Sequence, residues 1–156
     1  MAQDHYKPKR VEIAEDMDVW KKAHALTIDI AKLTKDFPIA EWSGISQRTK
    51  NTAIDIPIAI ESGFNKRQYR EKLNEYQSAI DRLNQLRYLL RLSHDLKYSG
   101  SKKINNLLNS VEELSNMLHG LLKAIEKKSN TNTNTNPNQQ HQRRPDQRQQ
   151  KPQTEN

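Results

Sequence analysis

The apolar residues of this chain recur at the spacing of an α-helix, and this periodicity restricts the fold more than any other feature of the sequence. The first stripe advances in steps of four and three residues through Val19, Ala23, Leu26, Ile30, Leu33 and Phe37. Such spacing draws one apolar face along a helix, which must be buried against other helices. We expect Pro38 to end this helix, because proline disfavours helical geometry in the residue before it.

Two later stripes predict two further helices. One runs through Leu73, Tyr76, Ile80, Leu83, Leu86 and Leu90. The other runs through Ile104, Leu107, Val111, Leu114, Leu118, Leu121 and Ile125. The sequence Ser-Gly-Ser at 99–101 lies between them and indicates a break in the helical structure.

The segment around residues 45–63 fits two interpretations. Its isoleucines alternate at period two, which is typical of a half-buried strand, at Ile54, Ile56, Ile58 and Ile60. A strand would have no partner, and Pro57 would remove a hydrogen bond from a sheet. A helical stripe through Ile45, Thr49, Thr52, Ile56 and Ile60 ends instead at Gly63, a residue type that closes helices. We therefore predict a helix with a kink near Pro57.

Composition supports a helical fold. The chain has four glycines and no cysteine. Hairpins and phosphate-binding loops rely on glycine at positive φ, so barrels, sandwiches and dinucleotide-binding folds are disfavoured. Without thiols there is no disulfide framework and no thiolate metal site. Four amphipathic helices joined by short connections predict an all-α fold, an antiparallel up-down-up-down four-helix bundle.

The chain divides into three predicted regions. Residues 1–10 form a short basic arm, residues 11–128 hold the bundle, and residues 129–156 form a disordered tail rich in Asn, Gln and Arg. The tail has no hydrophobic residue, so nothing offsets the cost of ordering its backbone. We expect it to serve either as a solvating tail or as a loose auxiliary contact for nucleic acid.

The net charge of +7 and the pI near 9.6 favour polyanionic partners. Residues 66–103 carry ten Lys and Arg against four acidic residues, which gives +6, whereas residues 11–65 sum to −3. We therefore predict that the third helix and its flanks bind RNA or DNA electrostatically, with low sequence specificity. The candidate residues are Lys50, Lys66, Arg67, Arg70, Arg82, Arg87, Arg91, Lys97, Lys102 and Lys103. The alternative is an ordinary solvated helix face.

Two isoleucines are left outside the predicted core stripes. On a helical second segment, Ile54 and Ile58 lie roughly opposite Ile56. A helix with two apolar faces needs a second partner, so we predict that Ile54 and Ile58 form an oligomer interface.

Other kinds of site are not indicated. No histidine has an i, i+4 partner suited to a helical zinc site, so we expect no metal and no cofactor. Ser93, His94 and Asp95 are consecutive, and on a helix they point in different directions, so we expect no catalytic relay and no enzyme activity. The apolar runs are too short to span a membrane and the N-terminus lacks the apolar core of a signal peptide, so we expect a cytoplasmic protein without membrane contact.

Residues 17–128 resemble the four-helix-bundle family of 23S rRNA intervening-sequence proteins. The segments that carry the resemblance are MDVWKKAHALTIDIAKLTKDFP at 17–38, ISQRTKNTAIDIPIAIESGFNKR at 45–67, and HDLKYSG with SNMLHGLLKAI toward the end. The stretch LNQLRYLLRLSHDLKYS is also similar, more distantly, to the accessory variability determinant proteins of diversity-generating retroelements. The chain departs from the family pattern at Asn51, where a second basic residue is usual.

The resemblance implies a bundle that often assembles as a homopentamer and has a role tied to RNA rather than to catalysis. We therefore expect a non-enzymatic, oligomeric RNA- or DNA-binding bundle. The alternative that the second resemblance implies is an accessory subunit that binds a reverse transcriptase together with its RNA or cDNA.

Overall fold

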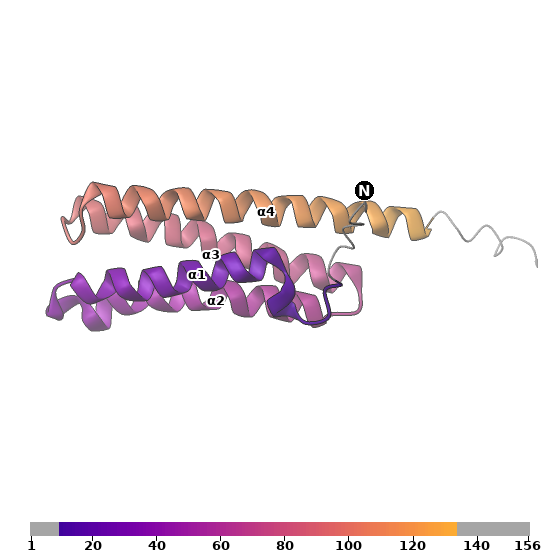
Figure 1. Cartoon of the computed structure of the whole chain (residues 1–156), viewed down its shortest axis with the longest axis horizontal. Helices are drawn as coiled ribbons and strands as arrows, with labels where there is room; N and C mark the ends of the chain where they lie inside the picture. Colours follow the sequence, from indigo (N-terminus) through magenta and orange to yellow (C-terminus); the bar gives the residue numbers. More distant parts are fainter. Residues whose placement is uncertain (1–9, 134–156) are drawn as a thin grey trace, which may run out of the picture.

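The computed structural model describes residues 10–133, in which four long helices run alternately up and down (Figure 1). They are α1 (Asp18–Leu33), α2 (Gln47–Asn65), α3 (Tyr69–Asp95) and α4 (Ser101–Thr133). Short helical turns precede α1 and join it to α2, namely η1 (Ala14–Asp16), η2 (Thr34–Asp36), η3 (Ile39–Glu41) and the π-helical η4 (Trp42–Ser46). This part of the chain has no strand. The predicted all-α, antiparallel four-helix bundle is confirmed.

The predicted stripes form the core of the bundle. Both α1 and α3 pack on α2 and on α4, so each helix contacts its two neighbours around a closed ring. Side chains from all four helices are fully enclosed in the centre, among them Ile30, Ile56, Leu83 and Leu114. Burial at ~25 cal/mol per Å² of apolar surface stabilises this arrangement, which helical propensity alone would not hold together.

The two ends of the bundle are built differently. At the loop end, on the left in Figure 1, residues 34–46 join α1 to α2 and residues 96–100 join α3 to α4. Here Tyr98 Oη donates to Glu41 Oε1 at 3.1 Å and the Tyr98 ring lies 5.6 Å from that of Phe37, so the two connections contact each other. At the opposite end, the turn end, only residues 66–68 separate α2 from α3.

The ambiguous isoleucine segment is helical, and its proline is accommodated by a neighbouring helix. Pro57 lies inside α2 and cannot donate the bond that the carbonyl of Ala53 would otherwise accept. The Thr27 hydroxyl of α1 lies 2.9 Å from this carbonyl and 2.9 Å from the Ala23 carbonyl of its own helix, so the two oxygens share its single proton and the Ala53 carbonyl regains a donor in this way. The non-helical backbone angles of this segment lie at Gly44 in η4, before α2 begins, rather than at Pro57.

Two predicted boundaries need correction. The first α-helix ends at Leu33, not at Phe37. Phe37 is buried in the core as the extended residue that follows the 3₁₀ turn η2. The predicted boundary of the tail, residue 129, lies too early in the sequence, because α4 continues to Thr133. Helix elongation needs one new hydrogen bond per residue rather than an apolar side chain, and Asn132 Nδ2 also donates to Tyr69 Oη at 3.2 Å. The rest of the tail and the predicted N-terminal arm, apart from Arg10, lie outside the described residues.

Candidate nucleic-acid interface

Four of the ten predicted nucleic-acid-binding side chains are paired with carboxylates. The pairs, with their N···O distances, are Lys66–Glu75 at 4.0 Å, Arg82–Asp55 at 3.5 Å, Arg87–Glu112 at 2.7 Å and Lys103–Asp36 at 3.1 Å. Three of these carboxylates belong to elements other than α3 and its flanks, so the charge count along residues 66–103 does not reveal them. These four cations are less available to phosphate than the sequence suggests.

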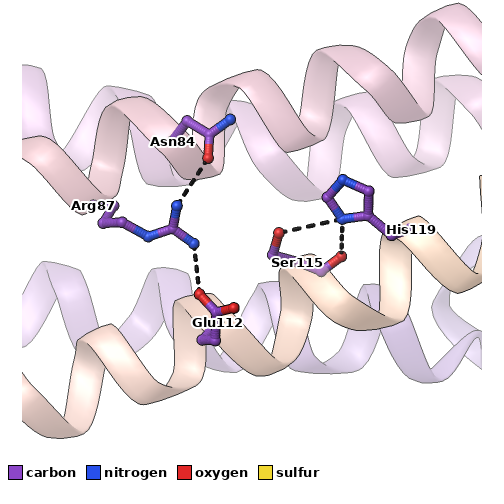
Figure 2. Close-up of polar contacts among 5 residues, drawn as sticks. All are labelled: Asn84, Arg87, Glu112, Ser115 and His119. Carbon is purple, nitrogen blue, oxygen red and sulfur yellow. Dashed lines mark hydrogen bonds and ion pairs between the residues drawn. The ribbon is translucent and has the colours of Figure 1, made fainter.

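Arg82 and Arg87 also lie on different sides of α3. Five residues turn a helix by about 140°, so the two side chains leave the core stripe on opposite flanks. Arg82 reaches Asp55 of α2, whereas Arg87 reaches Glu112 of α4, as Figure 2 shows for the second pair. The structure therefore does not bring the predicted residues of α3 together into one continuous basic strip.

The other six predicted cations have no carboxylate partner within residues 10–133. They are Lys50, Arg67, Arg70, Arg91, Lys97 and Lys102. Arg67 and Arg70 lie at the turn end, whereas Lys50, Lys97 and Lys102 lie at the loop end and Arg91 lies in the last two turns of α3. Unpaired cations therefore occur at both ends, and most of them lie at or near the loop end.

The prediction missed two cations at the loop end. Lys35 in η2 and Arg48 in α2 are both exposed, and neither has a carboxylate partner in the described part of the chain. They escaped notice because residues 11–65 carry a net charge of −3, which obscures a local cluster in this segment. The signal available in the sequence was that Lys35, Arg48 and Lys50 surround one connection.

Three adjoining grooves lie at this end of the bundle. The first, of about 530 Å³, is lined by Lys35, Trp42, Lys50 and Asn51, among others, and has no carboxylate in its lining. The second, of about 540 Å³, lies between α2 and α3, where Arg48 and Tyr88 line it, again without a carboxylate. A middle groove of about 630 Å³ shares residues with both. We call the three together the loop-end belt.

The predicted oligomer-interface residues are exposed, as expected for side chains outside the core stripe. Ile54 is 44% exposed and Ile58 is 57% exposed, while Ile56 between them is fully buried. Ile54 also lines the first groove of the loop-end belt. An apolar surface therefore adjoins the cationic surface on the same helix.

Lys97 has an unusual backbone for a candidate binding residue. Its φ of 61° is the one positive φ among the non-glycine residues described. The amide of Tyr98 donates to the Ser93 carbonyl and the amide of Lys97 donates to the His94 carbonyl, each at 2.9 Å. This pattern closes the C-terminus of α3 with the residue in the position that glycine usually takes.

Lys72, a cation of the same helix, is used for structure. Its Nζ donates to the carbonyls of Phe64 at 2.8 Å and Gly63 at 3.1 Å, which lie in the last turn of α2, where carbonyls lack the usual helical donor four residues on. The Gly63 carbonyl also accepts from the Lys66 amide at 3.3 Å. Burial lowers the pKa of Lys72. This ammonium is therefore engaged with backbone at the turn end and is not part of a phosphate-binding surface.

Figure 2 also shows a serine–histidine pair within α4; a separate pair, His94 Nε2 and Ser101 Oγ, joins α3 to α4 at 2.8 Å. His119 Nδ1 lies 2.7 Å from the Ser115 carbonyl and 3.4 Å from the Ser115 hydroxyl, so the nitrogen that faces the serine donates to backbone. Ser115 is only 6% exposed. This contact positions the histidine ring over its own helix and does not activate a nucleophile.

The described residues contain neither a cluster of metal ligands nor a membrane-spanning helix. Between residues 10 and 133, no three His, Asp or Glu side chains gather as they would around a metal ion. None of the helices described combines the length and the apolarity that crossing a bilayer requires.

Comparison with known proteins relates the chain to one family. A model of the 23S rRNA-intervening sequence protein family matches residues 15–120. Among solved structures, the chain is similar to a protein of unknown function from the S23 ribosomal protein family of Bacteroides thetaiotaomicron, with a TM-score of 0.62 and 20% identity. The match covers 67% of this chain and 95% of that one, and it shows that the fold is shared. No curated protein matches the chain.

Proposed function

The chain belongs to the 23S rRNA-intervening sequence protein family, and from this premise we propose that it is a non-catalytic RNA-associated bundle that binds at its loop end. The observation that supports the proposal is the set of cations there without a carboxylate partner in residues 10–133. These are Lys35, Arg48, Lys50, Lys97 and Lys102. RNA is the partner because a surface of unpaired cations binds phosphates and because of the family to which the chain belongs.

The position of the charges makes this end a better phosphate-binding surface than α3. A cation that contacts phosphate releases condensed counterions, and the entropy of this release supplies the affinity. A cation that is already paired must first give up its carboxylate, so Arg82 and Arg87 gain less from binding. The binding surface therefore includes only part of the region that is richest in basic residues.

A matched pair of charge reversals tests where RNA binds. The loop-end variant is Arg48→Glu with Lys50→Glu, and the turn-end control is Arg67→Glu with Arg70→Glu, so the net charge changes equally in both. We expect the loop-end variant to lose at least about tenfold in affinity for a structured RNA at about 50 mM salt, and the control less than about threefold. Fluorescence anisotropy measures both, and circular dichroism verifies the fold.

Two results would contradict the proposal. Equal losses in the two variants would mean that only the net charge matters, and no binding by the unaltered chain at low salt would remove RNA association altogether. Binding that appears only after a reverse transcriptase is added would favour the accessory-subunit alternative.

The exposed isoleucines of α2 support self-association as part of the same proposal. Ile58 lines none of the grooves of the loop-end belt and is stabilised when a second copy covers it, whereas Ile54 lines the first groove. We expect sedimentation equilibrium to give an oligomer at micromolar concentration and Ile58→Asp to reduce its mass. A monomer at that concentration would contradict this part of the proposal.

A further inference from the structure

Two aromatic rings are exposed in the loop-end belt, and the bundle does not need them for its core. Trp42 is 56% exposed and Tyr88 is 64% exposed. They come from η4 and from α3, and each lines a different groove of the belt. An exposed ring with cations beside it and no carboxylate in the same groove is a surface on which a nucleobase can stack.

The grooves that hold these rings are continuous around the N-terminal half of α2. The middle groove shares Gln47 and Asn51 with the Trp42 groove, and it shares Arg48 and Gln85 with the Tyr88 groove. A chain-like ligand that follows the three grooves over the exposed face of α2 can therefore reach both rings.

The carboxylates in the belt are confined to its middle groove, and both are engaged. Glu41 accepts a hydrogen bond from Tyr98 Oη at 3.1 Å, and Asp55 lies 3.5 Å from Arg82 Nε. Neither carboxylate belongs to the groove of Trp42 or to that of Tyr88. The two ring-bearing grooves therefore present cations and hydrogen-bond donors to an approaching ligand.

The two paired arginines orient amide groups toward the Tyr88 groove. Arg87 Nη1 donates to Asn84 Oδ1 and Arg82 Nη1 donates to Gln85 Oε1, each at 3.1 Å. A guanidinium has no acceptor, so the amide oxygens must face the arginines and the NH₂ groups remain as donors. Figure 2 shows Asn84 held in this way. Arg82 and Arg87 act here as positioning residues.

We propose that the loop-end belt binds an unpaired RNA strand, with one base stacked on Trp42 and another on Tyr88. The NH₂ groups of Asn84 and Gln85 donate to carbonyl or ring-nitrogen acceptors of the base beside Tyr88, and Lys35, Arg48 and Lys50 contact phosphates. This inference rests on the proposed function and specifies its substrate class. A duplex does not fit, because its bases are stacked on each other and present no free face to a ring.

The belt fits an RNA strand better than a segment of protein. Its ring-bearing grooves offer donors and positive charge, which match a ligand rich in acceptors. An acidic peptide supplies acceptors but has no regular series of flat faces for two separate rings. A strand of nucleotides supplies an acceptor-rich backbone and a π-face at each residue.

Binding of the full chain to single-stranded and double-stranded RNA tests the proposal. The probe is an unstructured RNA of about 20 nucleotides, used alone and annealed to its complement. We expect Trp42→Ala and Tyr88→Ala each to weaken binding of the single strand about tenfold and to leave duplex binding within about twofold. Tyr88→Phe keeps the ring and should bind as the unaltered chain does. The control, Ile39→Ala, removes a side chain that is 78% exposed and lines none of the grooves of the belt.

Tryptophan fluorescence gives a second readout that a structural role would not produce. The two tryptophans are Trp42 and Trp20, and Trp20 is half-buried, stacked on His24 with 4.9 Å between ring centroids. Single-stranded RNA should therefore quench the emission of Trp42 and leave that of Trp20. In Trp42→Phe the quenching should disappear while affinity stays within about threefold.

The outcomes separate this inference from the function on which it rests. Equal affinity for single strand and duplex, or unaltered binding by both alanine variants, would contradict the proposal that the loop-end belt binds an unpaired strand. The proposed RNA association would remain. Absence of binding to either RNA would remove the proposed function itself. If the ring variants changed the sedimentation coefficient and not RNA binding, the rings would be a protein interface and the inference would be wrong.

Discussion

The two ends of the bundle contain similar residues and use them in opposite ways. At the turn end, Lys72 donates to two backbone carbonyls and Tyr76 is 2% exposed against α2. At the loop end, Lys50 lines an open groove, and Tyr88, in the part of α3 nearer that end, is 64% exposed. A lysine or tyrosine of α2 or α3 is therefore structural or available for binding according to the end at which it lies.

The difference follows from how the chain reverses direction at each end. Three residues separate α2 from α3, so the two helices approach closely and every polar group between them must find a partner. The α1–α2 connection is longer and consists of short 3₁₀ and π turns, which leave side chains such as Trp42 outside the core. Long, irregular connections on a rigid bundle are a usual place for binding residues.

The largest expected effect is at the closest approach of the turn end. A Cβ added at Gly63 would lie 2.8 Å from Cε1 of the buried Tyr76 ring. We expect Gly63→Ala to lower the free energy of unfolding by ~2 kcal/mol, because overpacking outweighs the gain in helix propensity. Gly120→Ala in α4 is the control, since nothing lies within 4 Å of its added Cβ, and it should raise stability by up to ~1 kcal/mol. Urea denaturation measures both, and a stabilised Gly63→Ala would disprove the close contact.

Removing one lysine from each end should separate stability from binding. Lys72→Met leaves the Phe64 carbonyl without the ammonium donor and leaves the Gly63 carbonyl with the Lys66 amide alone, and we expect it to lower stability by ~1.5 kcal/mol with little change in RNA affinity. Lys50→Met should lower RNA affinity about threefold and change stability by less than ~0.5 kcal/mol. For both variants, urea denaturation measures the stability and fluorescence anisotropy measures the RNA affinity. A reversed pattern would break the distinction between the ends.

The sequence predicted the fold well because the fold depends on periodicity. Leu83, Leu86 and Leu90 repeat at helical spacing, and all three are fully buried in α3. The same rule predicts the helix over the isoleucines of α2, because Ile45, Thr49 and Thr52 continue the helical stripe of Ile56 and Ile60. The contact between Thr27 and the Ala53 carbonyl could not be predicted, because it joins residues 26 positions apart that only the packing of α1 on α2 brings together.

The candidate site was harder to predict for the same reason. Arg82 and Arg87 look free along α3, since their carboxylates lie on α2 and α4. Conversely, Arg48 lies in a segment of net negative charge, although it forms no ion pair with a carboxylate among residues 10–133. Local spacing predicts which face of a helix is buried, but pairing between charges on different helices depends on their register and rotation.

A smaller effect is expected from the buried tyrosine of the turn end. Burial raises the pKa of Tyr76 from 10.0 to about 12, so its phenol ionises more readily in the unfolded chain. The resulting stability is complete below pH 10 and is lost as the pH rises from 10 toward 12. The free energy of unfolding, measured by urea denaturation from about pH 8 to about pH 11, should fall more for the unaltered chain than for Tyr76→Phe. The difference should reach ~1 kcal/mol. Parallel pH profiles would mean that the ring is accessible to water. Lys72 and Tyr98, whose pKa values also shift, are present in both chains and cancel in the difference.

The smallest effect, and the one most informative about the loop end, is expected at Lys97. Its φ of 61° is strained for a residue with a Cβ, so Lys97→Gly should raise stability by ~0.5 kcal/mol. The same change removes an unpaired cation, so RNA affinity should fall about twofold, with a shallower dependence on salt. Lys102→Gln is the control, because it removes a charge at the same end without relieving a positive φ, and it should weaken binding without stabilising the fold. If Lys97→Gly were more stable and bound RNA as the unaltered chain does, Lys97 would not contribute to binding and would be excluded from the binding surface of the loop end.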